Sequence, residues 1–246
     1  MTPSGDALPT GSPIRSSPVL VSIIIPTLDE AVGIGTRLRA LQPLRERGHE
    51  VIVADGGSAD GTAELALPLV DRVIASPRGR ALQMNAGAAE ARGEVLIFLH
   101  ADTLLPDMPD LLVTGALTES RRAWGRFDVR IDGHHPMLPV IAFLMNLRSR
   151  LSGIATGDQA MFVTRDAFVR TGGFPAIALM EDIALSSRLR RISRPASLRA
   201  RVITSGRRWE KHGVARTILL MWRLRIAYFL GVAPTRLAER YLPHES

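Results

Sequence analysis

The stretch VLVSIIIPTLDE, residues 19–30, begins as a β-branched apolar run and changes at Pro26 to turn-forming and acidic residues. A short apolar run bounded by proline is typical of a buried strand. Further strands of this kind are expected at VIVAD (51–55), DRVIAS (71–76) and VLIFLHAD (95–102). Segments with helical spacing separate them, at 30–44, 60–70 and 80–91. Apolar strands that alternate with helices predict a mostly parallel sheet covered on both faces, in an α/β fold.

The second half of the chain is less regular. RFDVRI (126–131) alternates between apolar and charged residues, which predicts a half-exposed strand. Two more strands are expected at QAMFVTR (159–165) and SLRARVITS (197–205), and GGF (172–174) predicts a turn. Helices are expected at 136–151, from Asp166 onward, at 180–191 and over most of the remainder.

The composition limits the class of protein. The chain has 246 residues, 46% apolar and 22% charged, which is ordinary for a globular protein and excludes a disordered, collagen-like or coiled-coil one. Residues 1–18 are rich in proline, serine and glycine, and we expect a disordered tail there. Cysteine is absent, which excludes disulfides and thiol nucleophiles and fits a reducing, cytoplasmic location.

The net charge of +7 comes almost entirely from arginine, since Lys211 is the only lysine. Arginine binds phosphate through two parallel hydrogen bonds. The candidate partners are therefore nucleic acid, an anionic membrane surface and a phosphorylated substrate. Aromatic residues make up only 5% of the chain, which leaves few platforms for stacking bases and argues against nucleic acid.

Three aspartates follow predicted strands, namely Asp29, Asp55 and Asp102. In an open parallel sheet, ligands bind beyond the carboxyl ends of the strands. Three carboxylates at that edge repel one another unless a cation or hydrogen-bond donors lie between them, so the cluster favours a functional site. The alternative is that each aspartate only forms a turn.

A dinucleotide site is disfavoured. Gly33 and Gly35 follow the first strand and Asp55 ends the second, as in a dinucleotide-binding fingerprint. However, Leu38 stands at the third glycine position, and PTLDEAV separates the glycines from the strand. The sequence therefore argues against a nicotinamide or flavin enzyme.

A set of motifs in fixed order resembles glycosyltransferase family 2: PTLDE (26–30), VADGGSADGT (53–62), RGRALQMNAGAAEARGE (78–94), FLHAD (98–102), GGF (172–174), MEDIAL (180–185) and RRW (207–209). The likeness is greatest to short bacterial members whose fourth strand ends in HAD. It implies a GT-A fold, a Rossmann-like sheet with an acceptor-binding extension. We expect this domain over residues 19–210, with a nucleotide-binding half at 19–103, an acceptor half at 104–210 and a C-terminal helical segment at 211–246.

The resemblance implies that a sugar is transferred from a nucleotide diphosphate sugar, with inversion and with a divalent cation. The residues it implies for the donor are Pro26, Thr27, Asp29, Glu30, Asp55, Gly56, Gly57, Arg80 and Asn85. The two glycines let the backbone approach the nucleotide without a Cβ between them. For Arg80 the expected contact is a phosphate, and the alternative is a solvated arginine at a helix start.

Most family members bind the cation with a D-x-D motif, whereas this chain has His100-Ala101-Asp102. Asp102 keeps a hard oxygen ligand, and His100 is either a second ligand or a contact to the donor. Imidazole is a softer ligand than carboxylate, which favours Mn²⁺ over Mg²⁺.

An inverting transfer needs a base for the acceptor proton. The resemblance implies Asp182 for this role, beside Glu181 at a helix N-terminus, where a carboxylate also interacts favourably with the helix dipole. The residues expected near the sugar or acceptor are Gly157, Asp158, Gln159, Glu181, Arg208 and Trp209. The family's Q-x-x-R-W motif is incomplete, with Ser205 near the glutamine position, so a processive polymer synthase is not expected.

The segment TILLMWRLRIAYFLGVA (217–233) is apolar but short for a membrane span, and Arg223 and Arg225 interrupt it. One interpretation is a helix lying in the interface of an anionic membrane, at the inner face of the cytoplasmic membrane, with a lipid-linked acceptor. The others are a core helix and a dimer contact.

Two other functions stay open at this point. A nucleotidyltransferase acting on a sugar phosphate would share the sheet, the nucleotide and the carboxylates. It would need a basic, glycine-rich loop after the first strand, and PTLDEAVGIG has no basic residue. A non-catalytic sugar-nucleotide binder would be expected to lack Asp102 or Asp182, and both are present.

Overall fold

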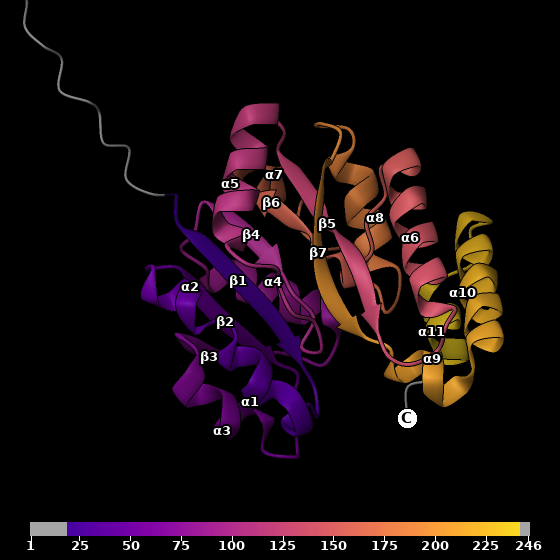
Figure 1. Ribbon diagram of the computed structural model, residues 1–246, viewed down its shortest axis with the longest axis horizontal. Coiled ribbons are helices and arrows are strands. Elements are labelled where there is room, and N and C mark those ends of the chain that lie inside the picture. Colours follow the sequence, from indigo (N-terminus) through magenta and orange to yellow (C-terminus); the bar gives the residue numbers. More distant parts are fainter. Residues whose placement is uncertain (1–18, 242–246) are drawn as a thin grey trace, which may run out of the picture.

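A computed structural model of the chain describes residues 19–241, without the side chains of Arg208, His212, Arg240 and Tyr241. The predicted tail at 1–18 lies outside the described residues. Seven strands form one sheet: β1 (Val21–Thr27), β2 (Glu50–Asp55), β3 (Arg72–Ala75), β4 (Val95–Phe98), β5 (Trp124–Asp132), β6 (Phe162–Thr164) and β7 (Ala196–Ser205). Their order is β3-β2-β1-β4-β6-β5-β7 (Figure 1).

The sheet is mostly parallel. β1 pairs in parallel with β2 and β4, β2 with β3, and β5 with β7. The exception is β6, which runs antiparallel between β4 and β5. The α/β fold expected from the apolar runs is confirmed.

The connections between strands are mainly helical. The helices are α1 (Ala31–Arg39), α2 (Gln42–Glu46), α3 (Thr62–Ala66), α4 (Arg80–Glu90), α5 (Pro109–Ser120), α6 (Leu138–Ser152), α7 (Arg165–Arg170), α8 (Glu181–Leu189), α9 (Arg207–His212), α10 (Val214–Phe229) and α11 (Pro234–Tyr241). Two short 3₁₀ turns, η1 (Leu67–Leu69) and η2 (Gly157–Gln159), complete the set. The expected helix at 60–70 is thus divided between α3 and η1, and α5 lies where the sequence analysis predicts no element.

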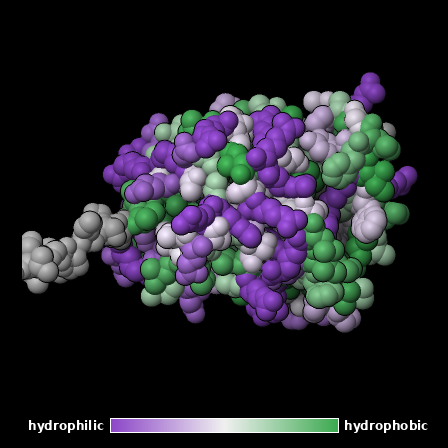
Figure 2. Space-filling model, turned by 90° about the horizontal axis from the view of Figure 1, so that it is seen from above, coloured by the Kyte–Doolittle hydropathy of each residue, from purple (hydrophilic) through white to green (hydrophobic). Residues whose placement is uncertain are grey.

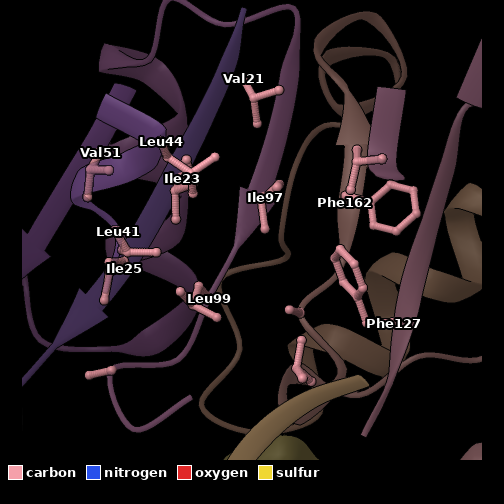
Figure 3. Close-up of a cluster of buried hydrophobic side chains, with 14 of the residues drawn as sticks. Val21, Ile23, Ile25, Leu41, Leu44, Val51, Ile97, Leu99, Phe127 and Phe162 are labelled. Carbon is pink, nitrogen blue, oxygen red and sulfur yellow. The ribbon is translucent and has the colours of Figure 1, made fainter. Parts of the chain in front are cut away.

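The core lies on both faces of the sheet. On one face, Ile23, Val53 and Ile97 pack with side chains from α1, α2, α5 and α6 (Figure 3). On the other face, Ile24 and Leu96 pack with side chains from α4, α7 and α8. Neighbouring residues of β1 therefore belong to opposite core layers, as the two-residue period of a strand requires.

The half-exposed strand expected at 126–131 is confirmed only at its end, where Arg130 is exposed. In β5 the other two charged residues of the pattern, Arg126 and Asp128, are buried, and they form an ion pair. Arg150 of α6 also donates to Asp128, at 2.6 Å. Because these charges satisfy one another under α6, both faces of β5 are buried at its start.

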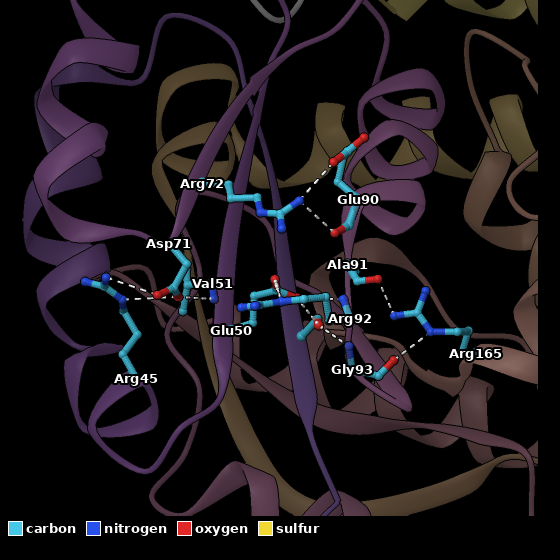
Figure 4. Close-up of polar contacts among 11 residues, drawn as sticks. Arg45, Glu50, Val51, Asp71, Arg72, Glu90, Ala91, Arg92, Gly93 and Arg165 are labelled. Carbon is cyan, nitrogen blue, oxygen red and sulfur yellow. Dashed lines mark hydrogen bonds and ion pairs between the residues drawn. The ribbon is translucent and has the colours of Figure 1, made fainter.

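A buried carboxylate connects the strands of the nucleotide-binding half. Glu50 is 1% exposed and accepts hydrogen bonds from the Ser22 hydroxyl at 2.6 Å and from the Arg92 guanidinium at 2.9 Å (Figure 4). The Arg92 backbone N–H donates to it as well, at 2.8 Å. This network holds the start of β1, the start of β2 and the segment before β4 together.

The C-terminal helices pack at one end of the molecule, beside α6 (Figure 1). Leu224 of α10 and Leu237 of α11 form a small apolar cluster with Met180 and Ile183 at the start of α8. Within residues 19–241, no helix combines the length and the apolar character that a membrane crossing needs.

Candidate active site

The loops after β1 and β2 are joined by hydrogen bonds. Asp55, which ends β2, is 8% exposed and accepts from the backbone N–H groups of Gly57 and Ser58, both at 2.9 Å. Burial raises the pKa of Asp55, but the bonds from Ser58, Gly57 and Thr27 outweigh it, so the pKa lies below its usual value. The result is an ionised acceptor group at the carboxyl end of β2.

The loop after β1 is hydrogen-bonded to the loop after β2. The Asp29 backbone N–H donates to the Ser58 hydroxyl at 2.9 Å, and the Asp29 carboxylate accepts from the Ala59 N–H at 2.9 Å. Asp29 has a φ of 53°, a left-handed conformation that aspartate tolerates better than most residues. Asp29 and Asp55, expected at one sheet edge, therefore do lie there together.

Behind these loops lies a residue that the sequence analysis did not single out. The Gln83 side-chain amide, on α4, donates to the carbonyls of Thr27 at 2.6 Å and Ala54 at 3.0 Å. A Cβ on Gly56 would come within 3.0–3.3 Å of that amide. Gln83 thus fixes the ends of β1 and β2, and it explains why position 56 holds glycine. Its only signal in the sequence is a polar residue on an otherwise apolar helix face.

Glu30 and Asp102 form a second acidic feature. Burial raises the pKa of Glu30, and the nearby charge of Asp102 raises it further. Arg207 of α9 lies 4.0 Å from the Glu30 carboxylate. Asp102 itself accepts from the Thr103 hydroxyl at 3.1 Å and faces the Thr204 hydroxyl of β7 at 3.5 Å. The two carboxylates follow the neighbouring strands β1 and β4 and repel each other there.

A single pocket brings together side chains from distant parts of the chain. His100 follows β4, Gly157 opens η2, and Glu181 and Asp182 begin α8. All four line the pocket, together with Met84, Phe98, Met161 and Phe174. His100, Gly157, Glu181 and Asp182 are all among the site residues expected from the sequence. The strand expected at 95–102 ends at Phe98, so His100 and Asp102 lie in the loop that follows.

Within the pocket, Asp182 is held by backbone donors. Its carboxylate accepts from the Gly157 N–H at 2.9 Å and from its neighbour Ile183 at 2.7 Å. The His100 ring packs directly on Gly157, where a Cβ would overlap the imidazole. His100 Nε2 is buried and has no hydrogen-bond partner within residues 19–241, and Nδ1 lies 3.6 Å from the Asp158 carboxylate. The hydrogen-bonding capacity of this buried nitrogen is thus unused.

Glu181 lies deeper than Asp182 and is 4% exposed. Burial raises its pKa, and the charge of Asp182 raises it further, while Arg80 lowers it. Arg80, at the start of α4, lies 3.7 Å from the Glu181 carboxylate. This contact connects the expected phosphate-binding arginine with the expected acceptor side.

The side chains that could act as metal ligands fit a divalent cation that is held mainly by its substrate. Within residues 19–241, no group of three or more acidic or histidine side chains is arranged to hold a metal ion. Mg²⁺ in phosphate-transfer sites commonly takes one or two carboxylates and completes its shell with phosphate oxygens and water. Asp102, with Glu30 and His100 near it, matches that smaller donor set.

A family model described as glycosyl transferase family 2 matches residues 22–176, which hold the motifs from PTLDE to GGF. The chain belongs to glycosyltransferase family 2.

Relatives of this family 2 chain match it over part of their length. It is 28% identical over 135 residues to an undecaprenyl-phosphate 4-deoxy-4-formamido-L-arabinose transferase of Pseudomonas paraeruginosa, covering 46% of this chain and 40% of the relative. It is 36% identical over 109 residues to the succinoglycan biosynthesis protein ExoA of Rhizobium meliloti, covering 38% and 33%. The chain thus spans two-fifths or less of the length of these relatives.

Solved structures share the fold. TarS of S. aureus, residues 1–349, superposes with a TM-score of 0.61 at 17% identity, covering 77% of this chain and 61% of that one. Glucosyl-3-phosphoglycerate synthase of Mycobacterium tuberculosis, in complex with Mn²⁺, UDP and glucosyl-3-phosphoglycerate, superposes with a TM-score of 0.55 at 17% identity, covering 76% and 71%. The GT-A arrangement expected for a family 2 member is confirmed.

Some expected site residues of this family 2 chain have structural partners. The Asn85 amide donates to the Phe174 carbonyl at 2.8 Å and accepts from the Phe174 N–H at 3.0 Å, which joins α4 to the GGF turn. Gln159 is fully buried, and its amide is bonded to Thr156 and Asn146. Its side chain thus points into the core, and the acceptor contact expected of Gln159 stays a prediction.

The end of the motif set lies on α9. Trp209 is partly buried and packs against the main core cluster. The Arg208 side chain lies outside the described part of the structure, so the expectation for it stays a prediction. The nucleotide contacts expected of Pro26, Gly56 and Gly57 likewise stay predictions, although all three lie at the carboxyl ends of β1 and β2.

Proposed function

We propose that this chain transfers a sugar, with inversion, from a nucleotide diphosphate sugar to a hydroxyl or phosphate acceptor. The observation that carries the proposal is the pocket in which His100, Gly157, Glu181 and Asp182 converge. Glu30, in the loop after β1, is close enough to His100 for their charges to interact. Family membership supports it, as do the UDP complexes of TarS and of the mycobacterial synthase.

The donor would lie across the carboxyl ends of β1, β2 and β4. Asp55 and the loop around Asp29 offer acceptors to the base and ribose, and Arg80 offers two parallel donors to a phosphate. Asp102 would hold the divalent cation, with His100 beside it. When bound, the cation stabilises the negative charge that develops on the leaving diphosphate.

Asp182 is the proposed general base. The acceptor oxygen attacks the anomeric carbon while its proton passes to a carboxylate oxygen of Asp182. The bond between the anomeric carbon and the diphosphate oxygen breaks, and the nucleoside diphosphate leaves with the electron pair. The hydrogen bonds from Gly157 and Ile183 orient the carboxylate, and each of its oxygens retains a further lone pair for the acceptor.

The donor half of the proposal is tested without knowing the acceptor. UDP-, GDP- and dTDP-sugars are each added with and without Mn²⁺, and the melting temperature is measured. A ligand at about 100 times its dissociation constant adds roughly 2.7 kcal/mol, which corresponds to a rise of several degrees. The Asp102→Asn variant should lose the Mn²⁺ dependence, and the matched variant Asp107→Asn, exposed in the following loop, should keep it. No shift with any donor would contradict the proposal.

The base is tested with water as the acceptor. Wild type is expected to release nucleoside diphosphate slowly from the donor that the melting panel identifies. Asp182→Asn should reduce that rate by about 10²–10⁴-fold, the usual contribution of a general base, with donor binding nearly unchanged. Asp166→Asn, at an exposed position of α7, is the matched control. A normal rate in Asp182→Asn would remove Asp182 as the base.

We further propose that one surface of the molecule lies against an anionic membrane. This apolar surface consists of exposed side chains of α6 and α10, including Phe143 at 63%, Leu151 at 77%, Trp222 at 64% and Phe229 at 71% exposure. Figure 2 shows hydrophobic residues gathered at the end of the molecule that carries these helices. Exposed arginines accompany them on α10, Arg216 and Arg223. An apolar face flanked by cations is complementary to anionic lipid.

Co-sedimentation with vesicles tests this surface. Binding should be strong to phosphatidylcholine vesicles that contain phosphatidylglycerol and weak to pure phosphatidylcholine. The double variant Trp222→Ser and Phe229→Ser should lose most of the binding. Val169→Ser changes an apolar residue that is 68% exposed on α7 and should bind like the wild type. Equal loss in both variants would contradict a specific membrane-facing surface.

A further inference from the structure

Two arginines from different helices lie close enough to the proposed base, Asp182, for their charges to interact with it. Arg148 lies on α6 and Arg225 on α10, and both are partly buried. Their charges are close enough to repel each other, and each is attracted by Asp182 and Asp158. These helices are far apart in the sequence but lie side by side in the fold (Figure 1).

Arg148 is incompletely satisfied. Its Nε and Nη2 atoms are buried, and neither has a hydrogen-bond partner within the described part of the chain. Burial, followed by repulsion from Arg225, lowers the pKa of Arg148 to about 10. A buried guanidinium that leaves donors unsatisfied is costly, and native proteins rarely keep one without a role.

Two neighbouring arginines differ from Arg148 because their charge is neutralised by an ion pair. Arg126 and Arg150 both bond the carboxylate of Asp128, which neutralises them locally. Arg148 has no such partner: the Asp182 carboxylate accepts from two backbone N–H groups, and Asp158 is nearly half exposed and faces His100. The pair Arg148 and Arg225 therefore presents positive charge and free Nε–H and Nη–H donors of Arg148 next to the proposed base.

We propose that Arg148 and Arg225 form an anion subsite that binds a phosphate group of the acceptor beside Asp182. This inference rests on the proposed function, since it places the acceptor beside the same carboxylate, Asp182. A phosphate monoester matches the site because the planar guanidinium donates two parallel hydrogen bonds to it. The anion also relieves the repulsion between the two arginines. The acceptor is therefore a phosphorylated molecule, either soluble or lipid-linked.

Binding of inorganic phosphate to the whole chain, without donor or metal, is the first test. Titration calorimetry at constant ionic strength should give one saturable site in the wild type. Arg148→Gln and Arg225→Gln should each weaken it by about tenfold or more, as expected for losing charge-assisted bonds. Arg39→Gln, at an exposed position of α1, should bind phosphate like the wild type.

Protection of Arg148 and Arg225 from a reagent that modifies arginine tests the same phosphate subsite without any substitution. Phenylglyoxal modification of Arg148 and Arg225, followed by mass spectrometry, should be slowed by inorganic phosphate, while the exposed Arg39 should react at an unchanged rate. This arm decides the matter if either glutamine variant fails to fold. No phosphate site in the wild type, or equal protection of all three arginines, would overturn the inference.

Vesicles distinguish the two sources of phosphate. With a lipid-linked acceptor, wild type prefers phosphatidylcholine vesicles containing phosphatidic acid over vesicles of equal charge containing phosphatidylglycerol, and Arg148→Gln loses that preference. With a soluble acceptor, inorganic phosphate binds but that preference is absent. The donor melting panel is independent of these measurements. A donor shift without phosphate binding therefore overturns only the subsite, and phosphate binding without a donor shift counts against the glycosyltransferase proposal instead.

Discussion

Gly157 is glycine because another residue occupies the space where its side chain would lie. A Cβ at this position would overlap the His100 imidazole, and the Gly157 N–H is a donor to Asp182. One residue thus fixes both the histidine that follows β4 and the carboxylate that begins α8. The close approach connects the proposed metal-side and base-side residues through a single backbone position.

Gly157→Ala should therefore lower the rate of donor cleavage by about tenfold or more, since small displacements of catalytic groups carry large rate penalties. In a His100→Ala background the alanine should fit, and the two effects should not add. The rate of nucleoside diphosphate release from the four proteins of this cycle is the measurement. Gly115→Ala, on α5 with only Glu119 at 4.0 Å, is the control and should keep full activity. Additive losses would show that the histidine contact is irrelevant.

At the level of the elements, the polar network around Glu50 replaces apolar packing at the start of β1 and β2. Burial raises the pKa of Glu50, but the hydrogen bonds from Ser22 and Arg92 lower it further than burial raises it. Its folded pKa therefore lies below the unfolded value near 4.5, so the stabilisation is present above that pH. It is lost as the pH falls through the folded pKa.

Glu50→Gln should cost about 1–3 kcal/mol of unfolding free energy at pH 7, because buried donors lose a charged acceptor. The difference from wild type should shrink as the pH is lowered below 4.5, where the wild-type carboxyl becomes protonated. Urea unfolding at a series of pH values measures both. Glu64→Gln, at an exposed position of α3, should show neither effect. A pH-independent difference would mean that the charge of Glu50 does not matter.

The elements also show how far the sequence alone reaches. Continuous apolar runs located β1, β2 and β4, because a strand buried on both faces needs no polar residue. The same reasoning failed at β5, where Arg126 and Asp128 are charged yet buried as a pair. It placed His100 and Asp182 at the site through motifs. The sequence did not reveal that Gln83 bonds the ends of β1 and β2, nor the phosphate contact that we propose for Arg148. The role of a polar residue on a helix can be assigned only once its neighbours from other elements are known.

The whole molecule is organised around one sheet. The nucleotide-binding half supplies β1 to β4, and the acceptor half supplies β5 to β7. Two core layers cover the faces of this sheet, and the first contains residues of both halves, such as Val21 and Phe127. The halves expected from the motifs at 19–103 and 104–210 thus share one sheet and one core layer.

Unfolding should accordingly be one cooperative transition. The chain has three tryptophans, and Trp124 of β5 is fully buried. In the variant Trp209→Phe with Trp222→Phe, the fluorescence of Trp124 reports on the acceptor half alone. Its urea transition should coincide with that of the far-UV circular dichroism, which reports on all elements. A second, separate transition would show that the halves unfold independently.

The antiparallel strand β6 has a consequence for protein engineering. It comes from the acceptor half but is hydrogen-bonded to β4 of the nucleotide-binding half on one side and to β5 on the other. A chimera made by joining the front of this chain to the back of a relative would put a foreign strand in the middle of the sheet. Donor and acceptor preferences should therefore be recombined by grafting the loops beyond β2 and β4 or the α6–α10 pair, with the central strands kept from one parent.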